Sequence, residues 1–444
     1  MLKTFRKGGI HPPENKLSSG TPITELALPK TVYIPLGQHI GAPATAVVQR
    51  GDMVKVGTLI AKASGFVSAN IHSSVSGKVS KLDEIVDASG YRKPVIVIEA
   101  DGNDEWEPEI DRSETLVKST PEDPKEIIDT LAQCGIVGMG GATFPTHIKL
   151  MPPKDVKAEV IIINGVECEP YLTADHRLML EHPDEILIGT SILMKAAGVS
   201  KAVIGIENNK KDAIELLRTK ATEYQGIEIL PLKVKYPQGG EKQLIHAVTG
   251  KMVGSGALPI SVGAIVQNVG TTFAVYEAVQ KHKPLLERIV TVTGKHLTKP
   301  SNFKVRIGTP IDSLITATGG EPEDTAKIIS GGPMMGRAIS TINAPVTKGT
   351  SGILLLDRAT TKRKPMRNCI KCAKCVSVCP MGLNPAFLMR DTVFKAWDRA
   401  EAGHIFDCIE CGSCSFTCPA NRPLLDQIRI GKQTVMGIIR SRKS

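Results

Sequence analysis

A doubled run of cysteines near the C-terminus constrains the fold of this chain more than any other feature. Each copy reads C-x2-C-x2-C-x3-C-P, with three cysteines at equal intervals and a fourth directly before a proline. Together the copies hold eight of the ten cysteines in the 444-residue chain. Thiolates at such short intervals indicate a bound inorganic group around which this segment must fold. The cysteines are Cys369, Cys372, Cys375 and Cys379, then Cys408, Cys411, Cys414 and Cys418.

The spacing predicts two [4Fe–4S] clusters, each held by three cysteines of one run and the last cysteine of the other. Three closely spaced thiolates can surround one cluster, whereas the fourth follows a longer gap and a proline fixes its direction towards the other cluster. The first cluster is therefore assigned to Cys369, Cys372, Cys375 and Cys418. The second is assigned to Cys379, Cys408, Cys411 and Cys414.

Zinc sites and disulfides are the alternative explanations of these cysteines. Structural zinc normally takes two C-x-x-C pairs, and a third cysteine at the same interval fits that pattern poorly. A disulfide framework is typical of secreted chains, and residues 1–20 contain no apolar signal-peptide core. We therefore expect iron–sulfur clusters. Because 368 residues precede Cys369, there is also room for roughly two or three further domains.

Composition and charge narrow the class of protein. The chain is 41% hydrophobic with only 4% aromatic residues, so its core depends on aliphatic side chains. No apolar stretch approaches the roughly 18 residues of a membrane span, and we expect a protein that does not cross a bilayer by itself. The net charge is +10, with basic residues gathered at 362–374 and 440–443. These patches favour an acidic redox partner or a membrane surface over nucleic acid, although a solvated basic face explains them equally well.

Residues 32–100 alternate short β-rich runs with glycine turns. The stretches AVVQRGDMVKVGTLI at 46–60 and IHSSVSGKV at 71–79 resemble the barrel-sandwich fold of biotinyl and lipoyl carrier domains. Those carriers present a modifiable lysine in an MKM or DKA context, and this segment has neither. We expect a scaffold domain here.

Residues 121–281 change to apolar runs separated by helical patterns. This alternation predicts a parallel α/β sheet, whose ligands bind in the loops beyond the carboxyl ends of the strands. The predicted strands lie at 159–163, 201–206, 227–230 and 264–266. The predicted helices lie at 177–197, 210–223 and 271–280.

Four loops in this region carry glycines and polar residues. The first, GIVGMGGATFPTHIK at 135–149, can bring main-chain amides close to a phosphate or a flat ring. It is not the dinucleotide fingerprint, because Thr143 stands at the third glycine position. The other loops are NGVECEPYLTAD at 164–175, YPQGGEK at 236–242 and QNVGT at 267–271.

These four loops resemble the flavin- and NADH-binding subunit of respiratory complex I. In that family G-x-G-G-A-x-F-P-x-x-x-K, N-x-x-E-x-E-P, Y-x-x-G-E-E and N-N-V-E-T hold FMN. The first two segments match well. The third carries an extra residue, and in the fourth Gln267 and Gly270 replace Asn and Glu.

The resemblance implies that these loops bind FMN. Its phosphate and ribityl chain would contact Gly138, Gly140 and Lys149, while Asn268 and Thr271 would close the phosphate end. The isoalloxazine side would be held by Asn164 and Glu167. The remaining implied cofactor contacts are Gly141, Phe144, Tyr236, Gly239, Gly240 and Glu241.

A few residues of these loops have separate interpretations. Glu169 would orient the nicotinamide and is the candidate catalytic residue. Phe144 would offer a stacking face, although a buried core position is the simpler interpretation of a single phenylalanine. Cys134 and Cys168 are interpreted as buried thiols, with a redox role for Cys168 left open.

The order of segments resembles the C subunits of Rnf complexes over almost the whole chain. FRKGGIHPPENK at 5–16 comes first, followed by the carrier-like domain, the FMN-type domain and the twin cluster motif. Residues 287–355 look like a soluble ligand-binding β-grasp module. The complex I subunit also has this module, but it has one cluster motif and lacks the carrier-like domain.

We therefore expect a multidomain α/β and α+β protein. It would comprise a barrel-sandwich domain, a Rossmann-like FMN-binding α/β domain, a β-grasp module and a helical 2[4Fe–4S] ferredoxin-like domain. The expected boundaries are an N-terminal extension at 1–30, then domains at 31–115, 120–284, 285–357 and 360–430, and a basic tail at 431–444.

By resemblance, the function is that of a peripheral subunit on the cytoplasmic side of the cell membrane. Its complex couples electron transfer between ferredoxin and NAD(H) to movement of Na+ or H+. The implied cofactors are FMN and two [4Fe–4S] clusters, with NAD(H) as substrate. The implied partners are other Rnf subunits, including an iron–sulfur subunit. Ferredoxin would be an indirect partner, and no nucleic-acid partner is expected.

Two other functions stay open on sequence alone. A cobalamin reductase of bacterial microcompartments resembles this architecture and also combines flavin with two clusters. A non-enzymatic electron relay would keep the clusters but would have lost flavin from the α/β domain.

Overall fold

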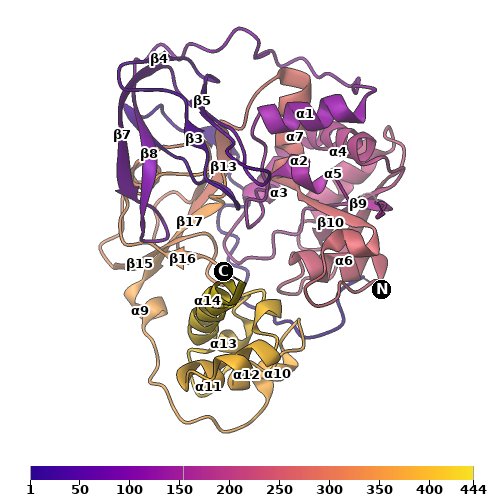
Figure 1. Cartoon of the computed structure of the whole chain (residues 1–444), viewed down its shortest axis with the longest axis vertical. Coiled ribbons are helices and arrows are strands. Elements are labelled where there is room, and N and C mark those ends of the chain that lie inside the picture. Colours follow the sequence, from indigo (N-terminus) through magenta and orange to yellow (C-terminus); the bar gives the residue numbers. More distant parts are fainter. Residues whose placement is uncertain (1, 154, 444) are drawn as a thin grey trace.

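The chain folds into four structural units that follow one another along the sequence, coloured from indigo to yellow in Figure 1. A computed structural model describes residues 2–153 and 155–443. The barrel-sandwich and β-grasp units lie on one side of Figure 1 and the α/β unit on the other, with the helical C-terminal unit below them.

The first unit is a sandwich of two small antiparallel sheets. One sheet has the order β2-β8-β7-β4, and the other has the order β3-β5-β6. Alternate residues of β2 point inward, and Val32, Ile34, Ile96 and Ile98 are fully buried between the sheets. The strands are β2 (Thr31–Pro35), β3 (Thr45–Ala46), β4 (Met53–Val54), β5 (Leu59–Lys62), β6 (Ile71–His72), β7 (Gly77–Val86) and β8 (Arg92–Ala100).

The second unit is built on a four-stranded parallel sheet in the order β11-β10-β9-β12. The four predicted strands and their parallel arrangement are confirmed. Nearly all residues of β9 and β10 are buried, as expected for a parallel sheet covered on both faces. The strands are β9 (Val160–Asn164), β10 (Ala202–Glu207), β11 (Ile227–Leu232) and β12 (Ala264–Asn268).

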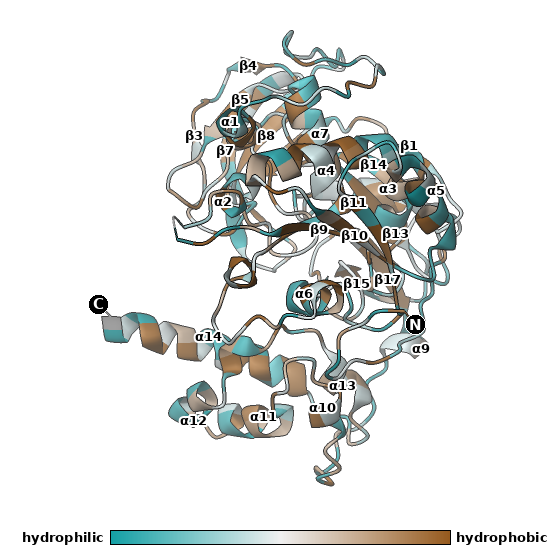
Figure 2. Ribbon diagram, turned by 90° about the vertical axis from the view of Figure 1, so that its right-hand side faces the viewer, coloured by the Kyte–Doolittle hydropathy of each residue, from teal (hydrophilic) through white to brown (hydrophobic). Residues whose placement is uncertain are grey.

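Helices cover both faces of this sheet. Ile161 and Ile163 of β9 pack with residues of α1, α4 and α7, whereas Val160 and Ile162 pack with α6. Figure 2 colours β9 and β10 mostly brown because both faces are apolar. The helices are α1 (Pro124–Gln133), α2 (Thr146–Lys149), α3 (Ala174–Glu181), α4 (Pro183–Ala197), α5 (Lys211–Ala221), α6 (Glu241–Thr249) and α7 (Val269–Lys281), with the 3-10 turn η1 (Pro259–Val262).

The single helix predicted at 177–197 is wrong, because the chain forms α3 and α4 with a break between them. His182 has φ −129° and ψ 47°, outside the helical region. Pro183 follows it, and a proline disfavours the helical conformation of the preceding residue. The break lets α4 start in a new direction and pack along α7.

The third unit is a β-grasp fold whose sheet has the order β1-β14-β13-β17-β15-β16. Its edge strand β1 (Ile23–Glu25) comes from the N-terminal extension and pairs in parallel with β14. The extension is therefore partly built into this unit. The other elements are β13 (Glu287–Thr293), β14 (Ser301–Arg306), α8 (Ile311–Ala317), β15 (Thr325–Ser330), β16 (Arg337–Ala338) and β17 (Gly352–Asp357).

The C-terminal unit is helical, and α9 (Arg358–Thr361) leads into it. Residues 431–443, expected as a basic tail, instead continue the 20-residue helix α14 (Leu424–Lys443). In the part of the chain that the structure describes, no helix has the length and apolarity of a membrane span. The remaining elements are α10 (Lys374–Ser377), α11 (Pro385–Val393), α12 (Trp397–Ala402), η2 (Ile405–Asp407) and α13 (Ser413–Thr417).

We predict that Gly189→Ala destabilises the α/β unit. A Cβ at Gly189 of α4 would overlap the carbonyl oxygen of Thr272 on α7, so the two helices would have to separate. Overpacking of this kind costs about 1–3 kcal/mol. Thermal unfolding followed by circular dichroism would measure the effect. Gly437→Ala on α14 is the matched control, because nothing lies within 4 Å of its added Cβ; equal stability of the two variants would contradict the prediction.

Candidate functional site

The glycine loop at 138–141 lies against the N-terminus of α7. The loop closes through a hydrogen bond from the Gly138 amide to the Phe144 carbonyl, 2.8 Å long. The Met139 amide donates to Thr271 Oγ1 over 2.9 Å. A Cβ at Gly140 would lie 2.9 Å from Cβ of Asn268, whereas a Cβ at Gly141 would meet open space. The loop therefore approaches α7 closely at Gly140, and Gly141 leaves its backbone accessible.

Asn164 and Asn268 end the neighbouring strands β9 and β12 and are paired in register. The Asn268 side chain accepts a hydrogen bond from the Gly270 amide over 2.8 Å and caps α7. Its Nδ2 donates to the Asp175 carboxylate over 2.7 Å. The parallel sheet thus brings two predicted residues to the same carboxyl edge, as its topology requires.

The YPQGGEK loop meets the same edge from the opposite side. Asn164 Nδ2 donates to the Gly239 carbonyl over 2.8 Å, and the Gly239 amide approaches Cys168 Sγ at 3.4 Å. Gly240 then forms the N-cap of α6, which begins at Glu241. A Cβ at Gly239 would lie 3.3 Å from Cys168 Sγ, which is a tight contact.

Lys149 is paired with Glu241, another residue that the resemblance implied. Its ammonium group donates to Glu241 Oε1 over 2.9 Å and to the Val266 carbonyl over 3.1 Å. The two side chains are 27% and 41% exposed, so the pair is open to solvent and to an incoming anion. Phe144 is half-buried beside this region.

Glu167 caps a helix in this structure. Its carboxylate accepts hydrogen bonds from the Asp175 amide at 2.8 Å and the His176 amide at 3.2 Å, at the start of α3. Glu167 adopts a φ of 45°, which turns the loop back towards that helix. Burial and the negative charge of Glu167 together raise the pKa of the neighbouring Asp175.

Arg288 and Asp175 are site residues that the sequence did not reveal. Arg288 is buried on β13 of the β-grasp unit, and its guanidinium reaches Met139 in the glycine loop, 2.7 Å from Sδ. Burial lowers the pKa of Arg288 to about 10, while the nearby Asp175 raises it. No local motif marks Arg288, because it reaches the loop only through contact between two domains.

Glu169 faces away from the glycine loop, towards the β-grasp and C-terminal units. Its carboxylate accepts hydrogen bonds from the amides of Met334 at 3.1 Å and Met335 at 2.8 Å. It also accepts a hydrogen bond from the Tyr236 hydroxyl at 3.3 Å, and the same hydroxyl lies 2.8 Å from the Cys411 carbonyl. Burial raises the pKa of Glu169. The predicted residues Glu169 and Tyr236 therefore lie between the flavin-type loops and the cysteine domain.

One set of four cysteines lines a small cavity between α11 and α14. The same cavity is closed by apolar residues that include Leu388, Leu425 and Ile428. Burial, together with the nearby thiols of Cys411, Cys408 and Cys379, raises the pKa of Cys414 to about 12. The lining cysteines are Cys379, Cys408, Cys411 and Cys414. This is the set assigned to the second cluster, and its four thiols converge on one cavity.

The other four cysteines lie nearer the surface. Cys375 and Cys418 are close enough to interact electrostatically, whereas Cys369 and Cys372 are exposed. The two runs are held side by side by the Arg367 amide, which donates to the Ala420 carbonyl over 2.9 Å. Among residues 2–153 and 155–443, no three metal-ligating side chains converge as they would on a single ion. A cubane spaces its ligands more widely, because each thiolate binds a different iron.

The two remaining cysteines differ in exposure, because Cys134 is buried whereas Cys168, also predicted to be a buried thiol, is partly exposed. Cys134 is buried, as predicted, and burial raises its pKa to about 12. Cys168 packs with Ile10, Tyr236 and Cys411, and burial raises its pKa as well. Both thiols therefore stay protonated at neutral pH.

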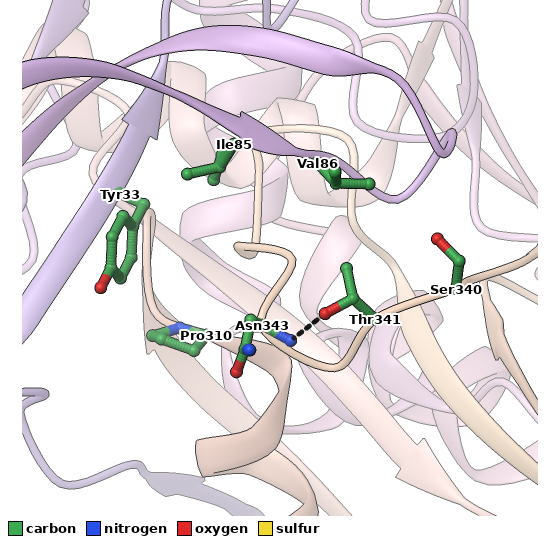
Figure 3. A pocket seen from close by; sticks show the side chains of 7 residues that line it. All are labelled: Tyr33, Ile85, Val86, Pro310, Ser340, Thr341 and Asn343. Carbon is green, nitrogen blue, oxygen red and sulfur yellow. Dashed lines mark hydrogen bonds between the residues drawn. The ribbon is translucent and has the colours of Figure 1, made fainter.

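A separate groove lies between the barrel-sandwich and β-grasp units (Figure 3). Its volume is about 610 Å³. It is lined by Tyr33, Ile85, Val86, Pro310, Ser340, Thr341 and Asn343. None of the predicted site residues lines it, so the groove lies outside the candidate flavin site.

The donor set at the strand edge fits a phosphorylated planar cofactor. The accessible Gly141 backbone, the Lys149 ammonium and the Asn164 carboxamide lie along the carboxyl edge of one sheet. The Gln267 side chain is 2% exposed, and within the described residues its Nε2 has no hydrogen-bond partner. A polar ligand group could satisfy that buried donor.

Comparisons with known proteins assign a family to each unit. Residues 3–103 match the family described as the RnfC barrel sandwich hybrid domain. Residues 131–277 match the Nuo51 FMN-binding domain, and residues 289–338 match the SLBB domain. Residues 360–422 match the 4Fe-4S dicluster domain. The chain therefore combines a flavin domain with a dicluster domain.

Two relatives that match over most of the chain are both C subunits of ferredoxin:NAD(+) oxidoreductase complexes. The C subunit of the proton-translocating ferredoxin:NAD(+) oxidoreductase complex of Clostridium ljungdahlii is 48% identical over 389 residues, covering 87% of this chain and 84% of that protein. The C subunit of the Na(+)-translocating ferredoxin:NAD(+) oxidoreductase complex of Acetobacterium woodii is 45% identical over 431 residues, 97% of each protein.

Solved structures give a likeness of fold. A chain of an NAD+-reducing [NiFe]-hydrogenase in the H2-reduced state has a TM-score of 0.50 and 19% identity. The match covers 70% of this chain and 63% of that one. The identity and coverage of the two whole-chain relatives decide the family. The present protein belongs to the C subunits of ion-translocating ferredoxin:NAD(+) oxidoreductase complexes.

Proposed function

We propose that this chain is the peripheral subunit through which a membrane-bound complex exchanges electrons with NAD(H). The complex transfers electrons between ferredoxin and NAD(H), and it couples this transfer to the translocation of Na+ or H+. The observation that carries the proposal is the contact at Tyr236, whose hydroxyl lies 2.8 Å from the Cys411 carbonyl and 3.3 Å from Glu169. It brings the cysteine cavity directly against the flavin-type loops.

The residues at the carboxyl edge of the sheet are suited to hold FMN. The backbone of Gly140 and Gly141 and the Lys149 ammonium would bind its phosphate, since amides and a lysine neutralise that charge. Asn164 would offer polar contacts to the ring side. Bound FMN supplies the exchange between the paired electrons of nicotinamide and the single electrons of the clusters. Glu167 and Thr271 would act indirectly, because their side chains hold α3 and the glycine loop in place.

The two cysteine sets support an order of electron carriers. The set lining the cavity lies beside Tyr236, so the second cluster would be the one near the flavin site. The set that includes the exposed Cys369 and Cys372 would carry the first cluster, at the protein surface. Electrons would therefore enter or leave the protein at the first cluster.

A basic surface surrounds these exposed cysteines. Lys362, Lys364, Arg367, Lys371 and Lys374 are all exposed, and Met366 and Ile370 beside them are 60% and 69% exposed. An acidic iron–sulfur subunit of the complex suits a surface of this charge. The cytoplasmic face of the cell membrane is the proposed location, because basic surfaces are attracted to its anionic lipids.

Lys149→Ala should weaken FMN binding about 10- to 100-fold. The variant removes a charge-assisted hydrogen bond to phosphate, which is worth about 1.5–3 kcal/mol. Titration of flavin fluorescence with the apoprotein would measure the dissociation constant. Lys251→Ala is the matched control, since Lys251 also pairs with a glutamate of this unit, Glu159. Equal FMN affinity of the two variants would exclude Lys149 from the phosphate site.

Cys379→Ser and Cys411→Ser should remove the same cluster. Anaerobically reconstituted protein should contain about eight irons, and each variant should lose about four of them together with one paramagnetic resonance signal. Cys418→Ser should instead remove the signal of the first cluster, whose assigned ligands include Cys375. Cys168→Ser is the control and should keep both signals. If Cys379→Ser removed the cluster of its own run, the crossed assignment would be wrong.

Lys371→Glu combined with Lys374→Glu should slow electron exchange with the acidic partner subunit. We expect about a tenfold loss of rate at low salt that shrinks as salt is added, because the lost attraction is electrostatic. Stopped-flow absorbance of NADH-reduced holoprotein mixed with that subunit would give the rate. Lys211→Glu, an exposed position on α5, is the charge-matched control. If NADH did not reduce the wild-type holoprotein, the proposed function itself would be refuted.

A further inference from the structure

The N-terminal segment is the one sequence motif to which the proposed electron route gives no role. We name residues 3–18 the N-terminal strap. The strap begins along the edge of the α/β unit, where Lys3 forms a bridge with Leu232 beside the end of β11. Phe5 is 2% exposed and lies beneath the ammonium group of Lys235, 4.1 Å from the ring centre. This end of the strap is therefore anchored to the flavin-type unit.

The middle of the strap contacts the segment that carries Cys379. The Gly9 amide donates to the Val378 carbonyl over 2.9 Å. Gly8 has a φ of 65°, and a Cβ there would lie 2.5 Å from the Val378 carbonyl oxygen and 2.6 Å from the carbonyl carbon of Cys379. Only glycine permits this approach, since any side chain would push the cysteine segment away.

The next residue of the strap ties this segment to the flavin-type loops. Ile10 and Tyr236 exchange two backbone hydrogen bonds of 2.8 Å and 2.9 Å. The Ile10 side chain is buried in the apolar cluster that includes Cys411 and Cys168. Gly9 and Ile10 thus touch both cysteine runs that line the cavity and the tyrosine that faces them.

The end of the strap holds the loop that carries Glu167 and Glu169. The Lys16 ammonium donates to three carbonyls of this loop, those of Glu167 at 2.8 Å, Glu169 at 2.9 Å and Leu172 at 2.7 Å. Burial lowers the pKa of Lys16. The Tyr171 amide also donates to the Glu14 carbonyl over 2.8 Å. An irregular loop cannot satisfy these carbonyls internally, so Lys16 fixes its path.

We propose that the strap is a positioning element that sets the spacing between the Glu167–Glu169 loop and the second cluster. The proposal rests on the proposed function, because that function requires electrons to cross this spacing. Backbone groups of Gly8, Gly9 and Ile10 contact the cysteine segment and Tyr236. At its other end the strap contacts the Glu167–Glu169 loop through Lys16. Transfer over such a gap depends steeply on distance, so a small displacement has a large effect on rate.

Gly8→Ala and Lys16→Met test the proposal in the full-length holoprotein. Each should slow NADH-driven cluster reduction by a measurable factor in rapid-mixing experiments, because electron transfer slows steeply as the two carriers move apart. Flavin and iron contents should stay at wild-type values. Lys16→Met should also speed hydrogen exchange of amides in residues 165–173 by about tenfold or more, because the loop loses its anchor.

One matched control, Lys7, lies in the strap, and the other, Gly20, lies just beyond its end. Gly20→Ala has open space around its added Cβ, and Lys7 is exposed, so Gly20→Ala and Lys7→Met should behave as wild type. The proposal is overturned if the test variants match these controls in both rate and exchange. It is also overturned if rate falls only in proportion to lost iron or flavin, which would mark a purely structural role. Wild-type protein that NADH cannot reduce would refute the proposed function, while hydrogen exchange would still decide whether the strap holds the loop.

Discussion

The site depends on how one irregular loop, residues 165–173, satisfies its backbone carbonyls. The loop leaves β9 and crosses the interface of three units without forming regular structure. Buried carbonyls without partners would be costly, and two lysine ammonium groups provide those partners. Lys16 binds three of the carbonyls, and the buried Lys210 donates to Val166 over 2.7 Å. Both cations therefore act as structural hydrogen-bond donors.

A second constraint is the burial of opposite charges beneath the glycine loop. Arg288 comes from the β-grasp unit, and Asp175 comes from the flavin-type unit. The two groups attract each other electrostatically, so each lowers the cost of placing the other in this site. The β-grasp unit consequently belongs to the site, because its arginine supports Met139 at the centre of the glycine loop.

The cysteine domain is arranged with one protected and one accessible end. Cys379, Cys411 and Cys414 are each less than 10% exposed and lie towards the flavin-type loops, whereas Cys369 and Cys372 are exposed among basic residues. Burial limits the access of solvent to the inner set. Exposure of the outer set suits exchange with another protein. The inner cysteine set is therefore shielded from solvent and the outer set is accessible to another protein, because of where each set lies in the domain.

Elements with a local signal could be predicted from the chain alone. Cysteine spacing predicted two cluster motifs, apolar runs predicted the four strands of the parallel sheet, and strand order brought Asn164 and Asn268 to one edge. The break at Pro183 was missed although its signal was present, because the helical pattern of the flanking residues outweighed one proline. The continuation of α14 through residues 431–443 was not predicted, because the basic residues there indicated a tail and obscured the helical spacing of the apolar residues between them.

Contacts between units, in contrast, arise only when the whole chain has packed. Packing between units directed Glu169 to the turn at Met334 and Met335 and brought Arg288 to the glycine loop. Packing within the α/β unit paired Lys149 with Glu241. It also placed the N-terminal strap between the loop and the cavity cysteines. Most of these contacts join residues more than 70 positions apart, and their partners depend on how complete units meet. Spacing along the chain carries no information about such packing.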